Sequence, residues 1–149
     1  MRLDGNNMIE LLSLSKHDKR IVEMLEELGK YSAINESQES TIFVPLENYG
    51  AEIMFDSKNC VTKQPTKLHL NQIKLTSQTS IKLPFDLNIG DDYQTVVKKI
   101  GQEESYKNKF MNNRLHWDMN DGLKKYKMNI NFKSTDLQEL EKITLVLAS

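Results

Sequence analysis

The sequence of 149 residues contains one cysteine, three prolines and six glycines. The single cysteine, Cys60, excludes an intrachain disulfide and gives no sign of an oxidising compartment. None of the glycines lies in a phosphate-binding pattern, so nucleotide binding has no support. With 38% hydrophobic and 28% charged residues, the composition is typical of one globular domain.

Long hydrophobic runs are also missing. The longest run, "ITLVLA" at 143–148, is far shorter than the roughly 20 apolar residues that cross a bilayer. At the start, "MRLDGNNMIELLSLS" has Asp4, Asn6, Asn7 and Glu10 where a signal peptide needs an unbroken apolar stretch. We therefore expect no membrane partner and a cytoplasmic location.

An overall excess of one charge is missing as well, since the net charge of −1 predicts neither a nucleic-acid nor a membrane partner. The charges are unevenly distributed. Residues 21–57 contain eight acids and one base, Lys30. The acids are Glu23, Glu26, Glu27, Glu36, Glu39, Glu47, Glu52 and Asp56. This stretch favours a basic partner, although a solvated surface explains it equally well.

The first half contains one helix pattern followed by three strand patterns. Ser15 and Asp18 resemble a capping box, and apolar residues at helical spacing then predict a helix over 16–28 that ends at Gly29. Alternating residues predict strands at 41–46, 51–55 and 67–75. Pro45 indicates an edge strand, and Asn71 with Gln72 suggests a bulge in the third strand.

The second half repeats this order. Asp91 or Asp92 is the expected cap of a helix that ends at Gly101. Strands are predicted at 114–119, 124–132 and 142–147, and "Asn-Asp-Gly" at 120–122 is a hairpin signal. Trp117, in register with Leu115 and Met119, is expected in the core.

Landmarks such as Gly29 and Ile73 recur about 70 residues later as Gly101 and Ile143. We therefore predict an α+β fold of two α-β-β-β units, residues 1–76 and 81–149, that form one compact body. Each unit would pack a helix on one face of an antiparallel meander. The units would share a continuous sheet or pack side by side, with the other face of the sheet polar and accessible.

Catalytic and metal-binding patterns are missing. His17, His69 and His116 lie far apart without ligand spacing, so we expect neither a metal nor a cofactor. Cys60 has no neighbouring histidine, and the Asp91–Asp92 pair is explained by helix capping. We expect no catalytic residue and no enzyme. A hydrolase whose groups meet only in three dimensions, such as His69 and His116 with carboxylates, stays open.

A group of basic residues, with Tyr106 and Phe110 between them, allows two interpretations. The bases are Lys98, Lys99, Lys107, Lys109 and Arg114. Single-stranded nucleic acid could bind such a surface by charge and stacking. The alternative is a solvated helix end and loop whose aromatic residues pack on the core, and the pI near 6.3 favours it.

Four stretches resemble bacterial immunity proteins that accompany polymorphic or contact-dependent growth inhibition toxins. They are "ELLSLSKHDKRIVEMLEELGK", "IKLPFDLNIGDDYQTVVKKIG", "RLHWDM" and "LEKITLVLA". Ile100-Gly101 stands where that family usually has Leu-Gly, and Asp91 where it has Met or Ser. The duplicated helix and meander also resemble the secreted β-lactamase inhibitor protein and the small lipoprotein of the outer-membrane assembly machine, which are both binders.

The resemblance implies a protein that binds a cognate toxin, typically a nuclease with a basic groove, and blocks its active site or substrate surface. The alternative is a protein-binding adaptor that uses the open sheet. The expected contact residues are the acids Glu36, Glu39, Glu47 and Glu52 and, on the outward sheet face, the apolar Phe43, Tyr49 and Met54. Glu23, Glu26 and Glu27 are second choices.

Overall fold

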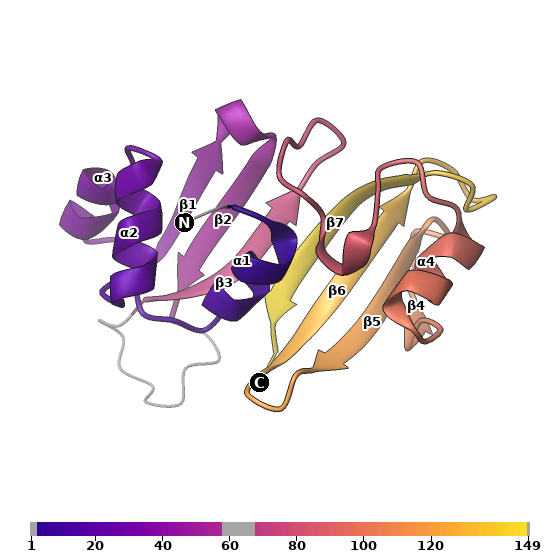
Figure 1. The fold of residues 1–149 in the computed structure, drawn as a ribbon. Coiled ribbons are helices and arrows are strands. Elements are labelled where there is room, and N and C mark those ends of the chain that lie inside the picture. Colours follow the sequence, from indigo (N-terminus) through magenta and orange to yellow (C-terminus); the bar gives the residue numbers. More distant parts are fainter. Residues whose placement is uncertain (1–2, 58–67, 149) are drawn as a thin grey trace.

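The computed structural model describes residues 3–57 and 68–148, which form an α+β fold. The strands are β1 (Thr41–Leu46), β2 (Ala51–Asp56), β3 (His69–Leu75), β4 (Tyr106–Lys107), β5 (Arg114–Asn120), β6 (Lys125–Phe132) and β7 (Leu140–Leu147). They make one 7-stranded antiparallel sheet in the order β1-β2-β3-β7-β6-β5-β4 (Figure 1). The helices are α1 (Gly5–Leu11), α2 (Lys19–Glu27), α3 (Tyr31–Glu36) and α4 (Tyr93–Ile100), with 3-10 turns η1 (Glu47–Tyr49) and η2 (Pro84–Asp86).

The two halves of the chain share a continuous sheet because β3 pairs with β7. This pairing joins Gln72–Leu75 to residues 143–146, with Ile73 opposite Leu145. The first part of β3 has another partner: the backbone of residues 13–16 exchanges hydrogen bonds with Leu68 and Leu70. Of the two arrangements that the sequence left open, the structure has the continuous sheet.

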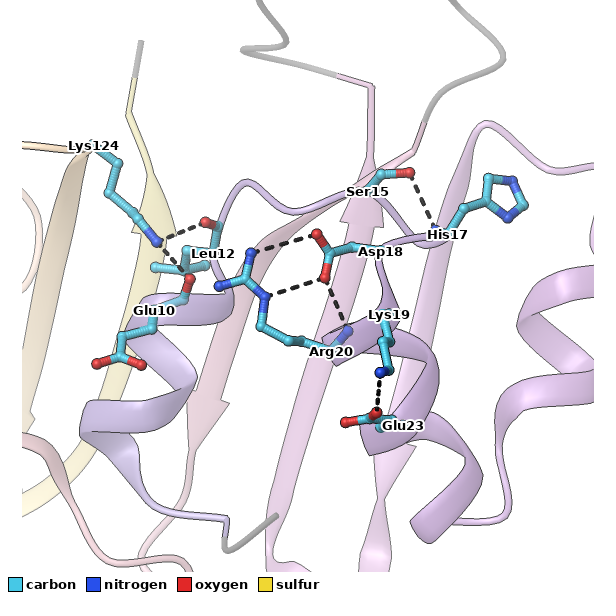
Figure 2. A network of polar contacts seen from close by, with 9 residues as sticks. All are labelled: Glu10, Leu12, Ser15, His17, Asp18, Lys19, Arg20, Glu23 and Lys124. Carbon is cyan, nitrogen blue, oxygen red and sulfur yellow. Dashed lines mark hydrogen bonds and ion pairs between the residues drawn. The ribbon is translucent and has the colours of Figure 1, made fainter.

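This pairing also corrects the predicted start of the first helix. Because Lys16 donates its backbone N–H to Leu68, residue 16 belongs to the segment beside β3 and not to the helix. The helix α2 begins at Lys19, and its N-cap is Asp18, whose carboxylate accepts from the backbone N–H of Arg20 at 2.9 Å (Figure 2). Ser15 accepts instead from the N–H of His17.

The second half follows its sequence signals closely. Asp92 caps α4 by accepting from the N–H of Thr95 at 2.8 Å, and Gly101 ends the helix with a φ of 92°. The turn between β5 and β6 contains Gly122 with a φ of 87°. These three expectations are confirmed, since each depends on local chemistry that does not need the rest of the fold.

One face of the sheet and the helices enclose the core (Figure 1). Apolar residues at alternate positions of the strands point toward the helices, and Trp117 is completely buried among them as expected. From the helices come Met8, Met24, Ile34 and Val96, one from each of α1 to α4. The core therefore runs through both halves without interruption.

The prediction of one helix per unit is wrong for the first half, which contains α1, α2 and α3. The helix α1 is held at both ends. At its start, Gly5 lies so close to Pro84 that a Cβ atom would come within 2.4 Å of the proline ring. At its end, Lys124 donates to the carbonyl oxygens of Ile9, Glu10 and Leu12 at 2.8 to 2.9 Å. Figure 2 shows the bonds to Glu10 and Leu12.

The opposite face of the sheet is polar, but it is only partly accessible. Several of its polar side chains are buried, so the expectation of an accessible face is wrong at Asp56, His116, Asn129, Asn131 and Thr144. Two other expectations are confirmed. Pro45 lies in the edge strand β1, and the register of β2 against β3 shifts at Asn71, which is the expected bulge.

Candidate functional site

In the described part of the chain, one face of the sheet carries no helix (Figure 1) and is called the open face below. Its side chains form rows because the strands are in register. The first row consists of Pro45, Glu52, Lys74, Thr144, Asn129, His116 and Tyr106. The second consists of Phe43, Met54, Gln72, Val146, Lys127 and Asp118. A third, shorter row consists of Lys142, Asn131 and Arg114. These rows are the candidate binding surface.

Three of the seven expected contact residues lie together on this face. Phe43 and Met54 are register partners on β1 and β2, and 58% of Phe43 is exposed. Glu52 is in the adjacent row, between Pro45 and Lys74. The β1–β2 end of the open face thus combines an apolar pair with the acid Glu52.

Tyr49 is not on the outward face, and its expected position is corrected. It belongs to η1, the turn between β1 and β2, and its side chain packs against the core. The alternation that predicts inward and outward positions ends where the strand ends, because a 3-10 turn rotates each residue differently.

The other expected acids lie around the end of the sheet. Glu47 pairs with Lys30 at 3.6 Å, and hydrogen bonding to its own backbone, followed by this ammonium, lowers the pKa of its carboxyl group. Glu36 ends α3, and Glu39 lines a shallow hollow between α3 and the segment before α2. Among the second choices, Glu23 pairs with Lys19 at 3.9 Å on α2 (Figure 2).

At the other end of the sheet, the expected packing of Tyr106 and Phe110 on the core is wrong. Phe110 is 92% exposed and Tyr106 is 40% exposed. Tyr106 stacks on His116 with ring centroids 4.6 Å apart, and its hydroxyl accepts from the ammonium of Lys127 at 2.7 Å. The short strand β4 holds Tyr106 there by pairing with β5.

Hydrogen bonds fix the imidazole of His116. Its Nδ1 lies 2.6 Å from the Oδ1 of Asn129, and its Nε2 lies 3.2 Å from the Nδ2 of Asn108. The Oδ1 of Asn108 accepts from the backbone N–H groups of Phe110 and Met111, so its NH2 group faces the ring. His116 therefore carries its proton on Nδ1, where it donates to Asn129.

The remaining polar candidates make contacts within the fold. Asp91 accepts from the N–H of Asn88 and from Lys99. His69 donates its Nδ1–H to the carbonyl oxygen of Ser13, and two strands, β7 and β6, separate its strand from that of His116. In residues 3–57 and 68–148, no three His, Cys, Asp or Glu side chains are placed to hold a metal ion. Cys60 lies outside the described residues.

Sequence reasoning missed Lys74, Asn131 and Lys142, which lie among the residues of the open face. Alternation on β3, β6 and β7 was a usable signal, because each of these three residues has buried apolar residues as neighbours along its strand. What the alternation could not give is the register that places Asn131 between Arg114 and Lys142.

Comparisons with protein-family models, curated proteins and solved structures found no match. The resemblance to immunity proteins therefore depends on the four sequence stretches alone. In the part of the chain that the structure describes, no helix has the length and apolar character needed to cross a membrane.

Proposed function

We propose that this chain is an immunity protein that binds a cognate bacterial toxin in the cytoplasm, blocks its active site or substrate surface and catalyses no reaction itself. The observation that carries the proposal is the open face. The helices of the described residues all pack on one side of the sheet, and an exposed Phe43 lies beside Met54 on the other side. Exposed aromatic and Met side chains in contact are typical of protein interfaces.

The charges near this pair suggest what the toxin presents. Glu52 lies on the open face, and Glu36, Glu39 and Glu47 lie around the same end of the molecule. A nuclease has a basic substrate groove, and carboxylates can imitate the phosphates that the groove binds. We therefore propose a nuclease as the toxin, with its groove against the β1–β2 end.

The proposal includes the two-unit arrangement of the chain, with residues 1–76 and 81–149 as α-β-β-β units. Two features support it: β1, β2 and β3 are consecutive antiparallel neighbours, and so are β5, β6 and β7. The third strands of the two units then meet in the middle of the sheet, where β3 pairs with β7.

The test identifies the reading frame directly upstream of this chain's gene, where we expect a toxin domain, and co-expresses that domain with this chain. We expect the chain to restore growth, and a register-pair variant, Phe43→Asp with Met54→Asp, to lose this protection while remaining folded. A matched control, Glu23→Lys with Glu26→Lys on α2, is expected to keep it. Growth arrest that persists with excess wild-type chain would contradict the immunity function and leave the adaptor alternative.

A further inference from the structure

The third row of the open face contains polar groups without partners. Arg114 lies opposite Asn131 in the β5–β6 register, and Asn131 lies opposite Lys142 in the β6–β7 register. Directly opposed residues have Cβ atoms roughly 5 Å apart, so the three side chains are adjacent. The row thus places a guanidinium, an amide and an ammonium side by side on the open face.

Two atoms in this row are buried and make no hydrogen bond to any described residue: the Nε of Arg114 and the Oδ1 of Asn131. The Asn131 side chain is only 3% exposed. Buried polar groups in folded proteins nearly always have partners, and a charged donor without one is especially costly. Because nothing fixes the orientation of the amide, Asn131 can turn its NH2 group toward an acceptor.

The two cations of the row have no counter-ion among the described residues. Among the described residues, no carboxylate lies within ion-pair distance of Arg114 or Lys142, although five other ion pairs are present. Lys127, in the next row but one, differs from them, because it donates to Tyr106 and has Asp118 as its register partner. The third row is therefore a cationic group of donors that has no anionic partner among the described residues.

We propose that this row, Arg114–Asn131–Lys142, binds an aspartate or glutamate carboxylate of the protein that occupies the open face. A guanidinium binds a carboxylate with two parallel hydrogen bonds, the neighbouring amide can donate another, and the ammonium adds charge. The inference rests on the proposed function and deepens it. The toxin would present an acidic residue here and its basic groove near Glu52.

A protein carboxylate fits the whole face better than a polynucleotide does. Phe43 and Met54 share this face and offer the apolar contact that protein interfaces use. Glu52 and the exposed Asp118 would repel a polyanion that extends along the rows. A single carboxylate, in contrast, needs only the local cations.

The experiment titrates the isotope-labelled protein with a glutamate-rich peptide of about ten residues and follows the Arg114 Nε–H and Asn131 NH2 resonances by NMR. A thymidine single strand of similar length is the second probe. We expect saturable shifts of both resonances with the peptide, and at least a roughly tenfold weaker peptide affinity in Arg114→Gln and in Lys142→Gln. Lys98→Gln, the same charge change on α4, is expected to stay within about twofold.

The inference is overturned by the absence of a peptide-induced shift at Arg114 and Asn131, and also by an equal loss of affinity in Lys98→Gln and Arg114→Gln. Tighter binding of the thymidine strand to the same row would show that the row binds a phosphate and not a carboxylate. Because the titration does not involve the toxin, a positive result without toxin neutralisation would reject the proposed function alone. Full toxin affinity in Arg114→Gln would reject this inference alone.

Discussion

At the scale of single residues, Lys124 ties the β5–β6 turn to the end of α1. Lys124→Met should lower the free energy of unfolding by about 1–3 kcal/mol, because three backbone carbonyl oxygens lose their donor. Urea denaturation measures this loss. Lys125→Met changes an exposed neighbour in the same way and should cost less than about 0.5 kcal/mol. Equal losses in the two variants would show that Lys124 does not clamp α1.

Tyr93 gives a prediction on pH. Burial, followed by a hydrogen bond to the carboxylate of Glu104, raises the pKa of Tyr93 to about 12. Since the folded pKa exceeds the ordinary 10.0, the stability linked to this proton is present below pH 10.0 and is lost as the pH rises toward 12.

Glu104→Gln should therefore lower the pKa of Tyr93 in an NMR titration, because the negative charge is removed. Burial remains, so this pKa should stay above the ordinary value. Tyr126, whose pKa burial raises to about 12, is the internal reference and should not change. An unchanged pKa for Tyr93 would mean that Glu104 does not contribute.

The expected contact residues show what alternation can predict at this scale. Phe43, Glu52 and Met54 lie on the open face as expected, because β1 and β2 keep a strict alternation. Tyr49 does not, because it lies beyond the end of β1 in a 3-10 turn. The Arg114–Asn131–Lys142 row could not be predicted, since it depends on the pairing of three separate strands.

At the scale of elements, the connection between β1 and β2 is held by the segment after β3. The carbonyl oxygen of Gly50 accepts from the N–H and hydroxyl of Thr76, and a Cβ atom on Gly50 would lie 2.5 Å from the backbone of Gln78. Gly101 also has a positive φ, but a Cβ atom on Gly101 would meet no described atom of another part of the chain within 4 Å.

These two glycines make a matched pair of substitutions. Gly101→Ala should cost about 1 kcal/mol of unfolding free energy, from backbone strain alone. Gly50→Ala should cost at least about 2 kcal/mol more, because the backbone of residues 78 and 79 must also move. Thermal and chemical denaturation measure both. Similar costs for the two variants would contradict the close packing at Gly50.

Elements with their own local signals could be predicted, and elements defined by contacts could not. The helix α4 and the β5–β6 hairpin have a cap, a stop glycine and a turn sequence. The helix α3 spans only 6 residues, and β4 spans 2 residues that become a strand by pairing with β5. The helix α1 had a usable signal in its N-cap Asp4 and its apolar Met8, Ile9 and Leu11.

At the scale of the whole molecule, one core joins the two halves through β3 and β7. Ile73 is fully buried at this junction. Ile73→Ala should lower the free energy of unfolding by about 2–5 kcal/mol. Trp117 fluorescence and amide hydrogen exchange in β2 should report the same transition, although they lie in different halves. Two separate transitions would contradict a single cooperative unit.

The central claim is that the open face binds the toxin. Its most direct test is the affinity of purified chain for an inactive form of the upstream-encoded toxin, measured by calorimetry. The variant Phe43→Asp with Met54→Asp should bind at least roughly 100-fold more weakly, and Glu23→Lys with Glu26→Lys should bind within about threefold of wild type. Wild-type affinity in the first variant, with a large loss in the second, would place the interface on the helices and contradict the account.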